Sequence, residues 1–173
     1  PLADIGHQLV NDFGFRFIKI REDLKEFEPL NDNTAPLSFD WSAYNTNFTQ
    51  QKLADWFQNV KAMSDAGAKI HLSAFFPPDW MSVPSNKVQR YKLDPNYPRP
   101  DLYQEIAELW AAPLVYLRDH YGVNVESVVV WNEPTDLWSS FQFTQSEYVK
   151  TVKALGQRFH AENLSTKIIV GDN

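Results

Sequence analysis

The chain has 173 residues, of which 43% are hydrophobic and 22% charged, a size and composition typical of one soluble globular domain. Its net charge of −6, without any long basic run, argues against a nucleic-acid partner or an anionic membrane surface, and no apolar stretch is long enough for a membrane span. There is no cysteine, which excludes disulfides and thiolate metal sites. Aromatic residues are abundant, at 14%, and such side chains suit stacking on sugar rings as well as core packing.

The amino-terminal region is predicted to form a helix and a strand. Apolar residues at helical spacing predict a helix over residues 2–13, and Gly14 follows as a stop signal. Residues 15–21 alternate aromatic or aliphatic with basic side chains, a pattern typical of a strand. No signal-peptide pattern precedes this region, so the chain is either cytoplasmic or a secreted protein without its leader, and we expect the second.

A long polar segment from Glu22 to about Phe48 is predicted to be a loop. Loops of this length in compact domains are usually functional or mobile. Its acidic residues are interpreted as a solvated surface, because no His-x-His or Glu-x-x-His spacing accompanies them, as a metal site would require.

The central region is predicted to contain a helix, a strand and irregular chain. Thr49 is predicted to be the N-cap of a helix that ends at Gly67. Residues 69–75 are predicted to form a strand, which two prolines end. The segment 82–100 is predicted to be irregular, because prolines interrupt it repeatedly.

The carboxyl-terminal region is predicted to alternate helices with short strands. A helix is predicted over residues 101–121, with Pro113 inside it and Gly122 as its stop. Residues 144–147 match a capping box that opens a further helix. Residues 167–170 are predicted to form a short apolar strand.

The stretch that organises the chain lies between these two helices. Residues 128–131 are a run of apolar side chains that predicts a strand buried on both faces, and Pro134 prevents its continuation. Asn132 and Glu133 therefore lie at the carboxyl end of a parallel strand, which is where α/β proteins bind ligands and place catalytic groups. The structural alternative is a strand-terminal Glu that is solvated or caps the next helix.

The alternation of helices with apolar strands predicts an α/β fold with a parallel sheet. A doubly wound sheet and a (β/α)8 TIM barrel both satisfy this pattern, but no G-x-G-x-x-G turn follows any strand, so a dinucleotide-binding fold has no positive support. A complete barrel needs about 250 residues and eight strands. The chain is therefore predicted to form part of a barrel, as one unit over residues 1–173.

Three segments resemble one group of enzymes. The sequence Trp-Asn-Glu-Pro at 131–134 resembles clan A of the retaining glycoside hydrolases, in which the fourth barrel strand ends in Asn-Glu-Pro. Residues 73–81 resemble the third-strand segment of family thirty, and residues 143–173 are similar to that family's helix after strand four and its strand five. Trp131 looks more like families five and thirty-nine. The resemblance covers helix one to strand five of the barrel.

The resemblance implies a role for each of five residues. Glu133 matches the general acid/base, for which a pKa raised by burial or by a second carboxylate is expected. Asn132 matches the amide that hydrogen-bonds the sugar 2-hydroxyl. Trp80 matches a cleft-lining Trp and Phe75 falls where the family often has Trp, although core packing is the alternative for both. Asp172 is expected to line the cleft.

The chain departs from the family at two places. The family has an Arg on strand two that holds the nucleophile, and a gap-free reading from Gly14 puts Lys19 there, with Arg16 and Arg21 nearby. Lys cannot make the bidentate contact of an Arg. The family's nucleophile is a Glu at the end of strand seven, outside the region of resemblance. We therefore expect a full-length protein that hydrolyses β-linked glycans with retention, and little activity in this chain alone.

Two other functions stay open. A carbohydrate-binding or pseudoenzyme chain would keep the aromatic cleft without the nucleophile. A metal-dependent hydrolase would use His71, Glu133 and Asp172, although a core histidine is the structural interpretation of His71. No cofactor is expected. Since an unclosed barrel sheet has two free edges and an exposed apolar face, we expect the remainder of the barrel, or self-association, to cover them.

Overall fold

The computed structural model describes residues 2–32, 35–84, 91–96, 99–133 and 141–171. Its helices are α1 (Leu2–Asn11), α2 (Trp41–Phe48), α3 (Gln51–Asp65), α4 (Arg99–Tyr121) and α5 (Gln145–Ala161), with the short 3-10 turns η1 (Leu24–Glu26) and η2 (Asp79–Met81). Its strands are β1 (Phe17–Glu22), β2 (Lys69–Ala74), β3 (Ser82–Pro84), β4 (Tyr91–Leu93), β5 (Ser127–Val129), β6 (Phe141–Gln142) and β7 (Lys167–Ile169).

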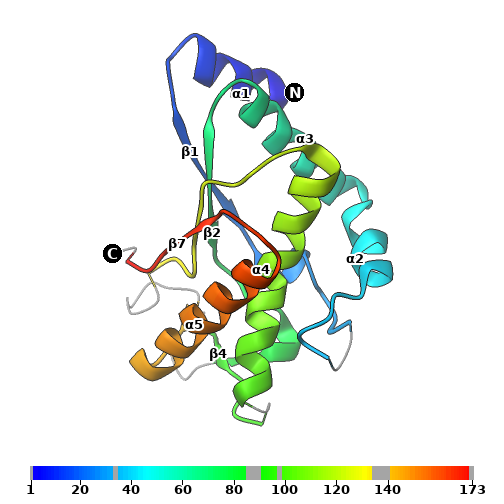
Figure 1. Ribbon diagram of the computed structural model, residues 1–173, viewed down its shortest axis with the longest axis vertical. Coiled ribbons are helices and arrows are strands. Elements are labelled where there is room, and N and C mark those ends of the chain that lie inside the picture. Colours follow the sequence, from blue (N-terminus) through cyan, green and yellow to red (C-terminus); the bar gives the residue numbers. More distant parts are fainter. Residues whose placement is uncertain (1, 33–34, 85–90, 97–98, 134–140, 172–173) are drawn as a thin grey trace.

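The main sheet has four parallel strands in the order β1-β2-β5-β7 (Figure 1). The register aligns Ile20 with Leu72, Leu72 with Val128, and Val128 with Ile168, so the carboxyl ends of all these strands meet at one edge. The predicted parallel α/β sheet is therefore confirmed. Strands joined by returning helices in this order are those of a partial (β/α)8 barrel.

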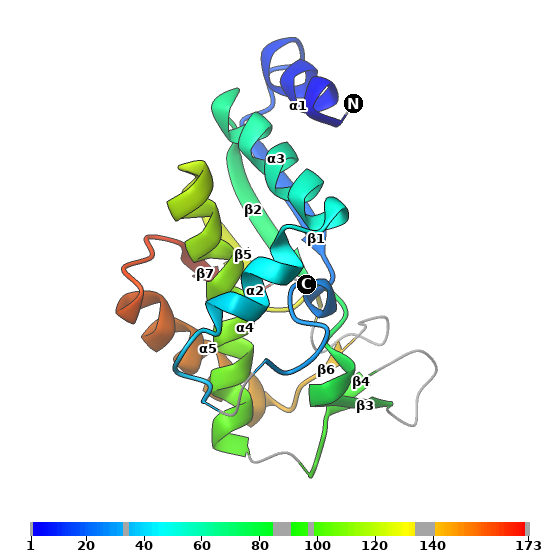
Figure 2. The same ribbon diagram turned by 90° about the vertical axis from the view of Figure 1, so that its right-hand side faces the viewer.

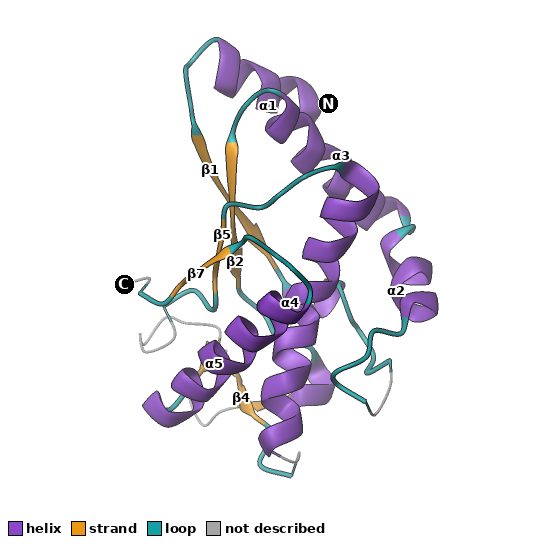
Figure 3. Ribbon diagram, viewed as in Figure 1, coloured by secondary structure: helices purple, strands orange, loops and turns teal. Residues whose placement is uncertain are grey.

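The helices gather on one side of the main sheet (Figures 1 and 3). Helix α4 is the most deeply buried, and its Trp110 is fully buried and donates its ring N–H to the backbone oxygen of Val130 at 3.3 Å. Phe57 of α3 and Leu155 of α5 are also fully buried in the same core. Each such side chain contributes about 1.5–3 kcal/mol when it leaves water. The core between sheet and helices therefore fixes the strands that carry the candidate site.

The opposite face of the sheet is open. Along β1, Phe17, Lys19 and Arg21 are exposed, whereas Ile18 and Ile20 face the core and are partly buried. Phe17 alone keeps 62% of its surface accessible. Alternate residues of a strand point to opposite faces, so the exposed residues mark the side that a closed barrel encloses as its interior.

The segment predicted as one long loop contains helix α2, and that prediction was wrong. The Asp40 side chain accepts hydrogen bonds from the backbone N–H groups of Ser42 and Ala43, which caps the helix. Tyr44 and Phe48 are buried on its inner face. This apolar stripe is only two turns long and lies among polar residues, so helical periodicity did not reveal it.

The predicted N-cap at Thr49 was also wrong. Thr49 follows the last residue of α2, and its hydroxyl donates to the backbone oxygen of Asn45 at 2.8 Å. Helix α3 starts two residues later, at Gln51, without a side-chain cap. A hydroxyl at a junction between two helices can serve either one, and here the C-terminus of the first helix takes it.

A second, three-stranded sheet lies beyond the carboxyl end of the main sheet, where irregular chain was predicted (Figure 2). Strands β3 and β4 pair antiparallel, with Ser82 opposite Leu93, and β4 pairs parallel with β6, with Lys92 opposite Gln142. These strands have only two or three residues, too few for an alternating pattern, and Pro84 lies at the end of one, where a ladder hydrogen bond is not needed.

The predicted helix stops and the capping box are confirmed. Gly14, Gly67 and Gly122 have φ of 73°, 97° and 66°, a conformation that favours glycine. The Thr144 hydroxyl accepts from the backbone N–H of Glu147, whose carboxylate accepts from the backbone N–H of Thr144. Among the described helices, none combines the length and the apolar character that a membrane span needs.

Replacing Thr144 by Ala removes one arm of this capping box. We expect the free energy of unfolding to fall by about 1 kcal/mol, measured by urea denaturation. Ser146→Ala is the matched control, because this exposed hydroxyl lies in the same first turn outside the box and Ala is a better helix former than Ser. Equal free energies of unfolding for the two variants would show that the capping box does not stabilise α5.

Candidate active site

Asn132 and Glu133 follow the end of β5 at the carboxyl edge of the main sheet, as predicted. The backbone N–H of Asn132 donates to the oxygen of Ala74 at 3.0 Å, which ties this turn to β2. Glu133 is half-buried and has φ of 47°. A residue with a branched or long side chain in this left-handed region costs about 1–3 kcal/mol, and such costs cluster at functional sites. Pro134 lies outside the described residues.

The turn begins with a bulge between β2 and β5. The backbone N–H of Glu126 donates to Ile70, and the N–H of Asn132 donates to Ala74. Between these two hydrogen bonds β2 advances from residue 70 to 74, whereas the other chain advances from 126 to 132. The two additional residues must bend out of the ladder, and bulges of this kind redirect side chains beside active sites. The bulge thus contains Trp131 and leads directly into Glu133.

Phe75 lies next to this turn and joins three parts of the site. Its backbone N–H donates to Glu22 at 3.0 Å, and its backbone oxygen accepts the ring N–H of Trp131 at 2.6 Å. The guanidinium carbon of Arg21 lies 3.8 Å from the centre of the Phe75 ring. One face of that ring therefore lies against a cation.

The three cationic residues in or beside β1 lie at different distances from the carboxyl edge of the sheet. Arg16 precedes the strand and donates to the backbone oxygen of Val10, far from the carboxyl edge. Lys19 pairs in register with His71, in the middle of the sheet. Arg21 lies one step closer to the carboxyl edge on the same face as Lys19. The structure thus brings Arg21, rather than Lys19, against Phe75, and the alternation of residues along β1 was the sequence signal for this pair.

Trp80 and His71 each have a defined partner. Trp80 is half-buried in η2, and its ring N–H donates to the backbone oxygen of Glu28 at 3.1 Å, so the ring bridges the loops that follow β2 and η1. The Nδ1 atom of His71 lies 2.5 Å from the hydroxyl of Ser127 in the middle of the sheet, and burial lowers the pKa of this imidazole. Asp172 lies outside the described residues. Within the described residues no cluster of His, Asp and Glu has an arrangement that fits a metal ion.

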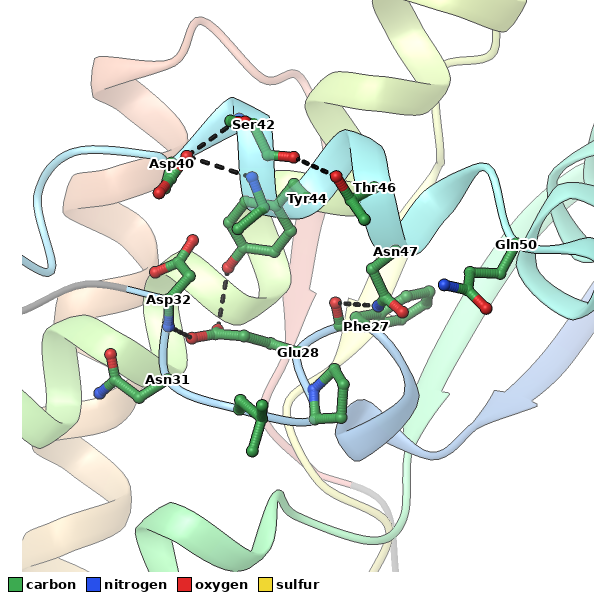
Figure 4. Close-up of a pocket in the computed structure, with 13 residues that line it drawn as sticks. Phe27, Glu28, Asn31, Asp32, Asp40, Ser42, Tyr44, Thr46, Asn47 and Gln50 are labelled. Carbon is green, nitrogen blue, oxygen red and sulfur yellow. Dashed lines mark hydrogen bonds between the residues drawn. The ribbon is translucent and has the colours of Figure 1, made fainter.

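A well-defined cavity lies away from Glu133. It has a volume of about 500 Å³ and lies between helix α2 and the loop after η1, where Phe27, Glu28, Asp32 and Tyr44 line it (Figure 4). Glu28 is 3% exposed, accepts the Tyr44 hydroxyl at 2.9 Å and accepts the backbone N–H of Asp32. The prediction that the acidic segment is a solvated surface was therefore wrong for Glu28, because α2 covers it.

Buried carboxyl groups accumulate behind this cavity. Burial raises the pKa of Glu28 to about 8 and that of Glu108 to about 9, and the neighbouring Asp32 adds to both shifts. Glu108 is fully buried on α4. The nearby Arg158 is 4% exposed and opposes the shift of Glu108, but it also lies 3.1 Å from a carboxylate oxygen of Glu162. Burial therefore favours the protonated form of Glu28 and Glu108 at neutral pH, and Arg158 opposes this only in part at Glu108.

These pKa values predict that the folded chain loses stability as the pH rises. In the folded chain Glu28 and Glu108 keep their protons up to about pH 8 and 9, whereas in the unfolded chain each ionises near its ordinary value of 4.5. The native state therefore binds more protons between these values, and its stability is greatest below pH 4.5 for these two groups and falls as pH rises through 8 and 9. The slope is at most about 1.4 kcal/mol per pH unit for each group.

Glu108→Gln tests this linkage, because Gln is close in shape and carries no ionisable group. We expect the variant to show a flatter decline of unfolding free energy between pH 5 and 9, measured by urea denaturation across that range. Asp55→Asn, on the exposed surface of α3, is the control that keeps the wild-type slope. An unchanged slope in Glu108→Gln would contradict the buried, protonated state of Glu108.

Comparison with protein-family models and with curated proteins gave no match. Comparison with solved structures gave clear matches, and those described below have low sequence identity. An endoxylanase of glycoside hydrolase family 30 from Clostridium papyrosolvens superposes with a TM-score of 0.66 and 20% identity, over 98% of this chain and 38% of the enzyme. The catalytic domain of the family 30 xylanase C from Talaromyces cellulolyticus gives a TM-score of 0.61 and 16% identity, over 99% of this chain and 43% of that domain.

A family 30, subfamily 8 xylanase from Clostridium acetobutylicum gives a TM-score of 0.60 with 17% identity, again over 98% of this chain and 38% of the enzyme. The chain thus spans about two fifths of the length of the solved structures it matches. The fold of this chain is similar to part of the (β/α)8 barrel of these solved family 30 structures, which confirms at the level of fold the resemblance that the sequence motifs indicated.

Proposed function

We propose that the full-length protein hydrolyses O-glycosidic bonds in β-linked glycans by a retaining double displacement, with Glu133 as general acid/base. The observation that supports this best is the place of Glu133, half-buried in a left-handed turn at the carboxyl edge of a sheet shared with family 30 hydrolases. Catalytic groups of barrel enzymes occupy this edge. Asn132, the adjacent amide, precedes it in the same turn.

The chemistry follows from two carboxyl groups on either side of the scissile bond. Glu133 protonates the leaving glycosidic oxygen and later takes a proton from the incoming water. A second carboxylate, about 5–5.5 Å away, attacks the sugar carbon and forms the covalent intermediate. We propose that this nucleophile comes from a part of the barrel outside the present chain. The Asn132 amide binds the sugar 2-hydroxyl, a contact that strengthens as positive charge develops on the ring.

Substrate binding is proposed for the residues around this turn. Phe75, whose ring lies against Arg21, and Trp80, whose ring lies beside the loop after β2, are proposed to contact the sugar through their aromatic rings. Lys19 and Arg21 add positive charge on the open face, where the second carboxylate of the mechanism would lie. Asp172 is proposed as a further group lining the cleft.

Glu133→Ala in the full-length protein tests the acid/base assignment. We expect kcat/KM on a glycan with a poor leaving group to fall by about 100-fold or more, because proton donation to that group is lost. Activity on an activated aryl glycoside should survive better, and azide should restore part of it by replacing the activated water. Initial rates on both substrates, with and without azide, provide the measurement.

Glu126→Ala is the matched control for this experiment. Glu126 lies at the amino end of the same strand, where it pairs with Lys167, and should leave the dependence on leaving group unchanged. If Glu133→Ala retains wild-type kinetics on the poor substrate, Glu133 is not the acid/base. If the unaltered full-length protein binds glycans without hydrolysing them, the carbohydrate-binding alternative replaces the enzyme.

The present chain alone is expected to lack turnover, since a retaining mechanism needs both carboxylates. We also propose that the open face of the sheet, with Phe17 exposed, is covered by further barrel strands or by self-association. The measurement is product release from a β-linked glycan by the purified 173-residue chain. Hydrolysis that disappears in Glu133→Ala, without any added segment, would show that the second carboxylate lies within this chain.

A further inference from the structure

The indole of Trp131 lies between the two loops that meet at the candidate site. It is fully buried, and its ring N–H donates to the backbone oxygen of Phe75 at 2.6 Å. Because Asn132 bonds to Ala74 in the neighbouring position, two consecutive residues of the turn are fastened to the end of β2. The two residues before Glu133 are therefore held in place by hydrogen bonds.

The indole also contacts two aromatic rings in the next described segment, which starts at Phe141. The rings of Trp131 and Phe141 have centroids 4.6 Å apart, and Phe143 lies 5.7 Å away in an edge contact. Phe141 begins β6, which pairs with β4 of the small sheet. One side chain thus contacts both the end of β2 and the start of β6.

Glu133 needs such an anchor because its backbone conformation is unfavourable. A Glu with φ of 47° has no intrinsic preference for this geometry, so surrounding contacts must impose it. Asn163 is the other described non-glycine residue with positive φ, and it lies just beyond the end of α5, where Asn is common. Among the described residues no helix ends at Glu133, and the contacts described for this turn come from residues 131 and 132.

We propose that Trp131 is a positioning residue for Glu133, acting through its N–H bond to Phe75 and its tilted ring contact with Phe141. This inference rests on the proposed function of Glu133 and extends it. Without the N–H bond, the bulged segment relaxes, and the carboxyl group no longer meets the leaving oxygen at hydrogen-bond distance. A misplacement of about 1 Å in such a group lowers the rate by about 100-fold.

The test uses Trp131→Phe in the full-length protein, which keeps an aromatic ring but removes the N–H donor. We expect kcat on a poor leaving-group substrate to fall by about 10- to 100-fold with KM changed by less than about threefold, and activity on an activated aryl glycoside to fall much less. The alkaline limb of the pH profile should shift as well, since the surroundings of Glu133 change. Replacement of Trp131 by its benzothienyl analogue, which exchanges only the N–H for sulfur, should give the same pattern even if the Phe variant folds poorly.

Trp110→Phe is the matched control. Trp110 is also fully buried, and its N–H donates to Val130 of the same segment, but from the helix side. It should lose stability in thermal unfolding without a change in leaving-group dependence. If Trp131→Phe and the benzothienyl variant keep the wild-type leaving-group dependence and pH profile, or if Trp110→Phe reproduces their pattern, the positioning role is refuted. If Glu133→Ala itself keeps the wild-type dependence on leaving group, the proposed function is refuted instead.

Discussion

The parallel pairing of β2 with β5 is the contact on which the rest of the molecule depends. These are the two inner strands of the main sheet, and each has a neighbour on both sides. Their register places Leu72 beside Val128 in the core and brings the residues after both strands to one edge. The site is therefore a consequence of register: a slip by one residue would turn every side chain to the other face and separate Glu133 from Phe75.

The two faces of this sheet are under different physical constraints. On the helix face, apolar side chains of α3, α4 and α5 fix the strands, and the backbone oxygen of Val130 is satisfied by Trp110. On the open face, polar and charged residues such as Lys19 and Arg21 lie in a row. The same strand thus obtains its stability from one side and presents its chemistry on the other, which is how barrel folds keep catalytic groups independent of the core.

The strands and long helices were predictable from the sequence because each carries its own signal. The prolines that end the strand at β2, the apolar runs at β5 and β7, the glycine stops and the capping box at Thr144 are all local patterns. Helix α2, β4 and β6 were not predictable, since their few residues form because of what they pack against. Glu28 shows the same limit: its segment is rich in acidic residues, and only the tertiary cover provided by α2 makes it buried.

Some features of the candidate site were likewise predictable from the sequence, and others were not. Asn132 and Glu133 could be placed at a strand end from sequence alone, because Pro134 marks where the strand must stop. The bulge at Trp131, the left-handed backbone at Glu133 and the guanidinium of Arg21 over Phe75 depend on pairing between strands distant in sequence.

The bulge at Trp131 and the left-handed backbone at Glu133 depart from the usual conformational preferences and lie within a few residues of each other. Asn163, the other non-glycine residue described with positive φ, follows the usual preference for a helix end. A backbone conformation that costs free energy and that core packing does not require is kept where another requirement, such as function, selects it. Here the hydrogen bond from Trp131 to Phe75 offsets the conformational cost at Glu133. From the helix side, Trp110 donates to the backbone oxygen of Val130, next to Trp131. Two buried tryptophans that bond to or lie on one short segment thus have separable roles: Trp110 of α4 belongs to the packing of the helices on the sheet, and Trp131 to the backbone geometry at Glu133.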